Sequence, residues 1–189
     1  MQQVLAEKVL TRSGAKPGAL ADGLLILLGG LFIAALAQVR IPLQPVPITG
    51  QTLAVLLVGM ALGSRRGPVA VLGYLGMAGA GLPFFTGAQA GLAYMAGPTG
   101  GYLLGFIPAA WLVGWLAERG WDRSLWTTLA AMGLGNLVIY VFGIAWLQTL
   151  MGGWSQALAA GLYPFLIGDT IKALLAALLL PAAWKLVKN

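Results

Sequence analysis

The sequence predicts an all-α integral membrane protein, a bundle of six transmembrane helices. Only 8% of its 189 residues are charged, whereas soluble domains carry about 25%, and its mean hydropathy is +0.87. Six apolar stretches, each near the roughly 17–25 residues that a spanning helix needs, cover residues 23–39, 48–63, 68–83, 99–117, 125–148 and 161–184. We therefore expect an N-terminal arm (1–22), a membrane domain (23–184) and a short cytoplasmic tail (185–189).

The N-terminal arm has the pattern of an amphipathic helix that lies on the membrane surface. Its apolar and charged residues alternate with helical spacing, with Val4, Leu5 and Val9 set against Glu7, Lys8 and Arg12. An alternative is a signal peptide, because Ala35-Leu36-Ala37 resembles a cleavage site after an apolar run. The long basic leader and the polytopic remainder favour the interfacial helix.

The basic residues predict the orientation of the helices. Arg65 and Arg66 separate the second and third stretches, and with a cytoplasmic N-terminus only Arg40 falls outside. The nine on the inner side are Lys8, Arg12, Lys16, Arg65, Arg66, Arg119, Arg123, Lys185 and Lys188. This bias predicts cytoplasmic termini and a multi-pass protein of the plasma membrane. The net charge of +6 does not indicate nucleic-acid binding, because the basic residues do not gather along one face.

Small residues recur at four-residue spacing in three places and give flat helix faces for close packing. Two of these sets, formed by glycines 59, 63 and 67 and by glycines 97, 101 and 105, favour contacts inside the bundle. The third set, Gly30 and Ala34 on the first helix, is the candidate contact with a partner membrane subunit.

The composition excludes several kinds of chemistry. The chain has no Cys and no His, so thiolate zinc sites and His-based catalysis are excluded. Its five acidic residues form no cluster within the membrane, and a lone intramembrane Asp cannot form an aspartyl pair. We therefore expect neither an enzyme nor a resident metal or cofactor. No Gly-Lys dipeptide occurs, so the chain lacks a Walker A loop and cannot hydrolyse ATP itself.

Two charged residues, Asp169 and Lys172, fall within the last apolar stretch. Charges inside a span are costly, and residues three apart share one helix face, so we expect an ion pair that binds a polar ligand in the outer half of the membrane. The alternative is a salt bridge that only holds helices together. Asn136, in the fifth stretch, is a further buried polar candidate, for ligand contact or for an interhelical hydrogen bond.

The two outer loops contain few charges yet look stiff. Residues 41–52 hold three prolines within a short span, which fixes an extended path, and residues 81–91 carry Phe84 and Phe85 among turn residues. Such loops are unusual as solvent-facing connectors and are typical of a lid over a ligand pocket. Simple re-entrant packing is the alternative.

Four sequence blocks together resemble the BioY family, the biotin-specific substrate-binding (S) subunits of energy-coupling-factor (ECF) vitamin transporters. The blocks are Pro45-Val46-Pro47-Ile48-Thr49-Gly50-Gln51-Thr52-Leu53, Gly81-Leu82-Pro83-Phe84-Phe85, Gly97-Pro98-Thr99-Gly100-Gly101-Tyr102-Leu103 and Gly168-Asp169-Thr170-Ile171-Lys172. The resemblance covers roughly residues 23–184. After the Phe pair the family often has Gly or Asn, whereas this chain has Thr86-Gly87-Ala88-Gln89, which leaves open the side chain that makes the polar contact there.

The resemblance implies the six-helix S-component fold, a biotin pocket on the outer side, and a partner module of one transmembrane coupling protein and two cytoplasmic ABC-type ATPases. A solitary biotin carrier without ATPases is the alternative. The ligand carboxylate would meet Gln51, Thr49 or Arg40. The full set of candidate ligand contacts is Asp169, Lys172, Asn136, Gln51, Thr49, Phe84, Phe85, Thr86, Gln89, Tyr94 and Arg40.

Overall fold

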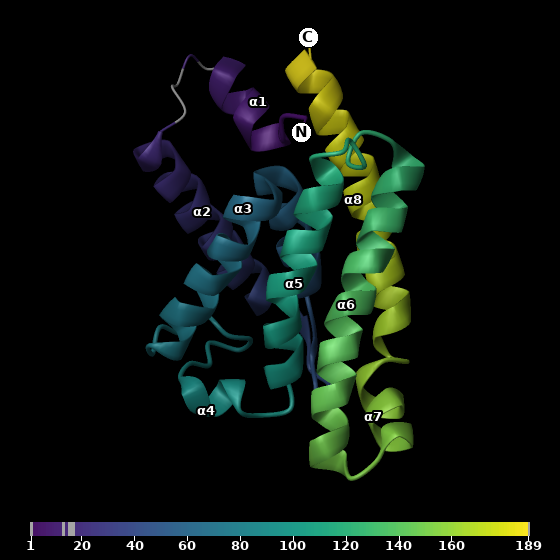
Figure 1. Cartoon of the computed structure of the whole chain (residues 1–189). Coiled ribbons are helices and arrows are strands. Elements are labelled where there is room, and N and C mark those ends of the chain that lie inside the picture. Colours follow the sequence, from purple (N-terminus) through teal and green to yellow (C-terminus); the bar gives the residue numbers. More distant parts are fainter. Residues whose placement is uncertain (1, 13, 15–17, 189) are drawn as a thin grey trace.

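The protein is mostly helical (Figure 1). The computed structural model describes residues 2–12, 14 and 18–188, so Lys16 of the predicted arm lies outside the described residues. Within this part, five helices are long and apolar enough to cross a membrane. They are α2 (Ala19–Gln38), α3 (Gln51–Gly79), α5 (Gly100–Ala117), α6 (Leu125–Met151) and α8 (Phe165–Lys188). The chain is therefore a multi-pass membrane protein.

The main difference from the predicted pattern is α3, which covers both the second and the third apolar stretch. Gly63 interrupts it with φ 85° and ψ 178°, a conformation that favours glycine. The two arms fold back on each other, because the Gln51 amide donates to the Tyr74 hydroxyl at 2.6 Å, whereas a straight helix would separate these residues by about 35 Å. The chain thus bends just before Arg65 and Arg66, and the count of six spans stays a prediction.

Helix α5 packs against this bend. A Cβ on Gly114 would lie 2.5 Å from the carbonyl carbon of Gly63, so the two backbones touch. Glu118, directly after α5, accepts hydrogen bonds from the amide and hydroxyl of Ser64 at 2.8 and 2.7 Å. The carboxylate thereby satisfies a free backbone amide at the start of the second arm. Gly59 also packs closely on α5, so this glycine set lies inside the bundle as expected.

The remaining long helices extend the bundle on the other side of α5. Helix α5 packs on α6, and α6 on α8. Gly101 and Gly105 allow the first approach, since a Cβ on Gly101 would lie 2.5 Å from the Phe142 carbonyl oxygen. Helix α6 starts at an N-cap, where the Ser124 hydroxyl accepts from the Thr127 amide at 3.4 Å.

Both termini lie at the same end of the bundle (Figure 1). The amphipathic pattern near the N-terminus forms α1 (Leu5–Arg12). Arg66 ties this helix to the bundle, because its Nη1 lies 2.9 Å from Glu7 and its Nε 2.8 Å from Asp22 of α2. Arg12 also donates to the Leu186 carbonyl of α8 at 2.7 Å. Helix α1 is thus joined to two long helices, α3 and α8, and Arg66 also links α3 to α2.

The opposite end of the bundle carries the short elements. Strands β1 (Arg40–Ile41) and β2 (Ile48–Thr49) pair antiparallel, with Arg40 opposite Thr49, and the proline-rich loop joins them. Helices α4 (Leu92–Met95) and α7 (Trp154–Gly161) lie at this end as well (Figure 1). The hydropathy pattern predicted none of these elements, and residues of the β1–β2 segment and of α4 line the outer cavity described below.

Gly30 and Ala34, the predicted contact with a partner subunit, lie on the side of α2 that faces α3. Both are buried, and a Cβ on Gly30 would lie 3.2 Å from the Ala70 carbonyl oxygen. The chain itself fills this face, because small residues let α2 and the second arm of α3 approach closely. In this structure α3 covers this face of α2, so a partner contact through Gly30 and Ala34 stays a prediction, and the opposite face of α2 is the exposed one.

Candidate functional site

The inner cavity, enclosed by α3, α5, α6, α8 and the loop before β2, has a volume of about 30 Å³. Such a volume holds about two water molecules, whereas pockets for small organic ligands measure about 300–1,000 Å³. Apolar walls come from Leu103, Phe106, Ile139 and Phe165, and the polar residues of the lining include Thr52, Tyr140, Asp169 and Lys172.

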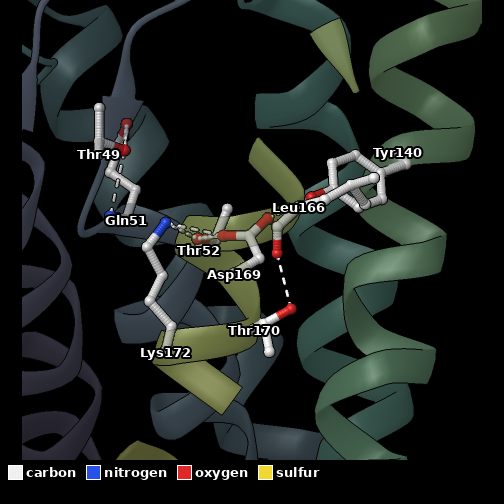
Figure 2. Close-up of polar contacts among 8 residues, drawn as sticks. All are labelled: Thr49, Gln51, Thr52, Tyr140, Leu166, Asp169, Thr170 and Lys172. Atoms are coloured by element: carbon white, nitrogen blue, oxygen red, sulfur yellow. Dashed lines mark hydrogen bonds and ion pairs between the residues drawn. The ribbon is translucent and has the colours of Figure 1, made fainter. Parts of the chain in front are cut away.

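These four polar residues form one hydrogen-bonded cluster. Asp169 and Lys172 share a face of α8, as their spacing predicts, with 2.8 Å between Nζ and Oδ1. The Thr52 hydroxyl donates to Asp169 Oδ1 at 3.1 Å and accepts from Lys172 Nζ at 2.9 Å. Tyr140 donates a hydrogen bond to Asp169 Oδ2. Figure 2 shows Tyr140 and Lys172 approaching the carboxylate from opposite sides.

The cluster offers hydrogen-bond donors and acceptors side by side in an apolar surrounding. Asp169 is only 5% exposed, and the Lys172 side chain 14%. A carboxylate only accepts hydrogen bonds, whereas an ammonium only donates them. Hydrogen bonds to charged groups are also stronger than those between neutral groups. The arrangement is therefore suited to a neutral polar ring that carries both N–H and C=O groups.

Thr49 and Gln51 line the inner cavity, but their side chains are bonded within the chain. Gln51 Oε1 accepts from the hydroxyls of Thr49 and Thr86 at 3.1 and 3.0 Å. Gln51 Nε2 donates to the Tyr74 hydroxyl, and Thr49 Oγ1 accepts from the backbone N–H of Gln51 at 3.2 Å. Gln51 therefore connects the two outer loops to the second arm of α3.

The vestibule is a second cavity, of about 580 Å³, whose walls are the proline-rich loop and the segments around residues 86–89 and 94–99. It shares Pro47 and Thr99 with the inner cavity, so the two cavities adjoin. Four of the predicted site residues line it, namely Arg40, Thr86, Gln89 and Tyr94. The structure thus divides the predicted residues between an inner cavity and an outer one.

Phe84 and Phe85 line neither cavity. Phe85 is fully buried, stacks on Tyr94 with 4.7 Å between ring centroids, and meets Tyr74 edge-on at 5.8 Å. The Phe85 ring therefore fixes the second loop to α3 and α4. The aromatic rings that line the inner cavity in this structure belong to Tyr102, Phe106, Tyr140 and Phe165, so a ligand contact by Phe84 or Phe85 stays a prediction.

Asn136 also lies outside the inner cavity. It lines an open groove of about 520 Å³ between α6 and α8, which shares Tyr140 and Asp169 with the inner cavity. Asn136 is 8% exposed, and its Oδ1 has no hydrogen-bond partner among the described residues. Asn136 thus lies on α6 one helical turn before Tyr140, and it is Tyr140 that belongs to the polar cluster.

Tyr140 and Thr52 complete the cluster but are absent from the predicted set. The sequence could have indicated Tyr140 as a site residue, because its phenol group falls within an apolar span, one helical turn after Asn136. Thr52 belongs to the proline-rich block from which only Thr49 and Gln51 were selected. No spacing rule joins Thr52 to Asp169, because the contact depends on how α3 and α8 pack.

Comparison with known proteins shows which family this sequence matches. The sequence matches the BioY family over residues 7–189. A biotin transporter BioY of Rhizobium etli is 42% identical over 155 residues, which cover 78% of this chain and 82% of the relative. A biotin transporter BioY of Thermotoga maritima is 36% identical over 157 residues, which cover 82% of this chain and 92% of the relative.

A solved structure agrees with this result. The crystal structure of the S-component for biotin from an ECF-type ABC transporter superposes on this chain with a TM-score of 0.77 and 26% identity, covering 88% of this chain and 92% of the other. The relatives are transporters and not enzymes. With a family match over nearly all of its length, this chain belongs to the BioY family.

Proposed function

We propose that this chain binds biotin as the substrate-specificity subunit of an ECF-type vitamin transporter, taking the ligand from the outer side of the membrane. The observation that carries the proposal is the buried cluster of Asp169, Lys172, Thr52 and Tyr140 in a member of a family whose relatives are biotin transporters. The proposed topology has six spans, with both termini in the cytoplasm and the vestibule outside.

The chemistry of biotin fits the inner cavity. Its ureido ring has two N–H donors and a carbonyl acceptor, which match the Asp169 carboxylate and the Lys172 ammonium. Its thiophane ring and the start of its valeryl chain suit the apolar walls around Phe106 and Phe165. Because the cavity measures about 30 Å³, binding requires the walls near Pro47 and Thr99 to move apart.

Uphill uptake then needs energy from other subunits, since the chain has no Walker A loop. The proposed partners are a transmembrane coupling protein and two cytoplasmic ABC-type ATPases. On α2, the face available to such a partner carries Leu24, Leu28 and Leu31, which are 52, 60 and 40% exposed. A chain that transports biotin without this module would instead be a solitary carrier.

The proposal is tested first by titrating the purified protein with biotin in detergent. Buried charged and polar partners around a rigid bicycle should give nanomolar affinity, about −12 kcal/mol. Lipoate is the matched control ligand, because it has a sulfur ring and a pentanoate chain but no ureido group. We expect lipoate to bind at least about a thousandfold more weakly. Micromolar or weaker biotin binding by folded protein would refute the assignment.

Transport is tested separately in reconstituted vesicles. Uptake of labelled biotin should require the coupling protein, the ATPases, and ATP on the side of the membrane that carries the ATPases. Equal uptake by vesicles that contain this chain alone would favour the solitary carrier.

A further inference from the structure

Asn136 has a buried amide oxygen that no described residue uses. The side chain is 8% exposed, and its Oδ1 has no hydrogen-bond partner among residues 2–12, 14 and 18–188. Buried polar atoms without a partner are rare in folded proteins, because such atoms have lost their contact with water and gained nothing in return. This oxygen is therefore free to accept from a donor that changes its partner when a ligand binds.

The Tyr140 hydroxyl is the donor best placed to reach this oxygen. Tyr140 follows Asn136 by four residues on α6, so the two side chains share a helix face. Long side chains of a helix lean towards its N-terminus, which brings the Tyr140 ring towards the turn that carries Asn136. Both residues line the α6–α8 groove, which offers about 520 Å³ of open space beside them. The hydroxyl can thus exchange acceptors by a rotation of its side chain, without any movement of α6.

In this structure the Tyr140 hydroxyl uses the carboxylate that the ligand needs. It donates to Asp169 Oδ2, while Oδ1 accepts from Thr52 and Lys172 (Figure 2). A ureido N–H that approaches Oδ2 therefore competes with Tyr140. The Tyr140 ring also lines the inner cavity, whose volume of about 30 Å³ is too small for a ring. Movement of this side chain towards the groove would free the carboxylate oxygen and enlarge the cavity at once.

We propose that Asn136 is a positioning residue for ligand binding, which accepts the Tyr140 hydroxyl when the ligand replaces it on Asp169. This inference rests on the proposed binding of biotin. Before the exchange, Tyr140 is bonded to Asp169 and the Asn136 oxygen has no partner. After it, the ligand N–H is bonded to Asp169 and the hydroxyl to Asn136, so no polar group is left without a partner. Asn136 acts through Tyr140 and does not touch the ligand.

The first test measures stability and affinity on Asn136→Leu, which replaces the amide by an apolar group of similar size. Without biotin, the variant should unfold at the same temperature as the natural protein or at a higher one, because the unpaired oxygen is gone. It should bind biotin about fivefold to 150-fold more weakly in calorimetry, because the displaced hydroxyl finds no acceptor. Thr170→Val removes a polar group from the same groove and should leave the affinity within about twofold.

The second test uses Tyr140→Phe to distinguish this role from direct contact with the ligand. Tyr140→Phe has no hydroxyl to displace, so it should bind biotin about tenfold more tightly, since a hydrogen bond to a charged group is no longer exchanged for a neutral one. Adding Asn136→Leu to Tyr140→Phe should then change the affinity by less than about twofold. A loss that persists without the hydroxyl would show that Asn136 contacts the ligand itself and would overturn the proposal. Weaker binding by Tyr140→Phe alone would overturn it as well.

Asn136→Ala keeps the test decisive if Leu does not fit at this position. It removes the same oxygen in a smaller residue, so it should weaken biotin binding to a similar extent, again only while the Tyr140 hydroxyl is present. Unchanged affinity in both Asn136 variants would refute the role of Asn136. Failure of the natural protein to bind biotin would instead refute the proposed function.

Discussion

Replacing Asp169 by Asn tests whether the buried cluster recognises the ligand or only holds the helices. Asn preserves the shape of the side chain but removes the negative charge that accepts hydrogen bonds from Lys172, Thr52 and Tyr140. The Lys172 ammonium is then left without its counter-charge beside an apolar cavity. Breaking a buried pair in this way typically costs about 3–5 kcal/mol of stability.

The same change should weaken ligand binding. If the carboxylate accepts from a ureido N–H, the loss of a hydrogen bond to a charged group is worth about 1.5–3 kcal/mol, or roughly a tenfold to 150-fold weaker affinity. The assay is calorimetric titration with biotin, paired with thermal unfolding in detergent. Thr170→Val is the matched control, because the Thr170 hydroxyl donates to the Leu166 carbonyl at 2.7 Å and, among the described residues, is not bonded to the cluster (Figure 2).

The double variant Asp169→Asn with Lys172→Met separates the two effects. Removing both charges leaves no unpaired ion, so the double variant should regain much of the stability that Asp169→Asn loses. Its affinity for biotin should stay low, because neither charged partner of the ring remains. Single variants that lose stability but bind biotin as tightly as the natural protein would show that the pair has a structural role only.

Three other measurements test the fold and its orientation. Gly63→Ala should lower the free energy of unfolding by about 1–3 kcal/mol, because Gly63 has φ 85° and the new Cβ would lie 2.9 Å from a Glu118 oxygen. Unchanged stability in thermal unfolding would mean that the bend does not depend on glycine. Burial raises the pKa of Asp122, so the free energy of unfolding should fall as pH rises from about 3.9 through the raised pKa, and Asp122→Asn should flatten that slope. Because the chain has no cysteine, Thr11→Cys and Gln156→Cys can be labelled singly in whole cells with an impermeant maleimide. Only the second should react, and the opposite pattern would overturn the proposed topology.

The sequence predicted the features that depend on local spacing or composition. Asp169 and Lys172 meet because residues three apart share a helix face, and charges within an apolar stretch are conspicuous. The amphipathic pattern near the N-terminus also depends on helical spacing, and helix α1 forms there. The boundaries of α5 and α6 lie within a few residues of the apolar stretches, because charged or turn-forming residues flank both.

Features that depend on packing between distant segments could not be predicted in this way. The aromatic pair of the second loop was expected to face the ligand, but Phe85 instead packs on Tyr74 and Tyr94, which only the fold-back of α3 brings together. Gly30 was predicted to contact a partner subunit, and its packing on α3 could not be predicted either. A small residue permits a close approach, but the sequence does not say whether the neighbouring helix belongs to the same chain.

The way Thr52 bridges the ion pair sets a condition on which ligands can enter. Its hydroxyl donates to Asp169 and accepts from Lys172, so every polar group of the cluster has a partner before a ligand arrives. A ligand that separates these groups has to supply both a donor and an acceptor, because an unsatisfied buried charge costs more than a lost neutral contact. A ureido ring supplies both from one rigid face, whereas a ring without N–H and C=O groups would leave the cluster closed over a cavity of about 30 Å³. Selectivity for the ring therefore follows from the cost of opening the cluster as well as from the contacts made after it opens.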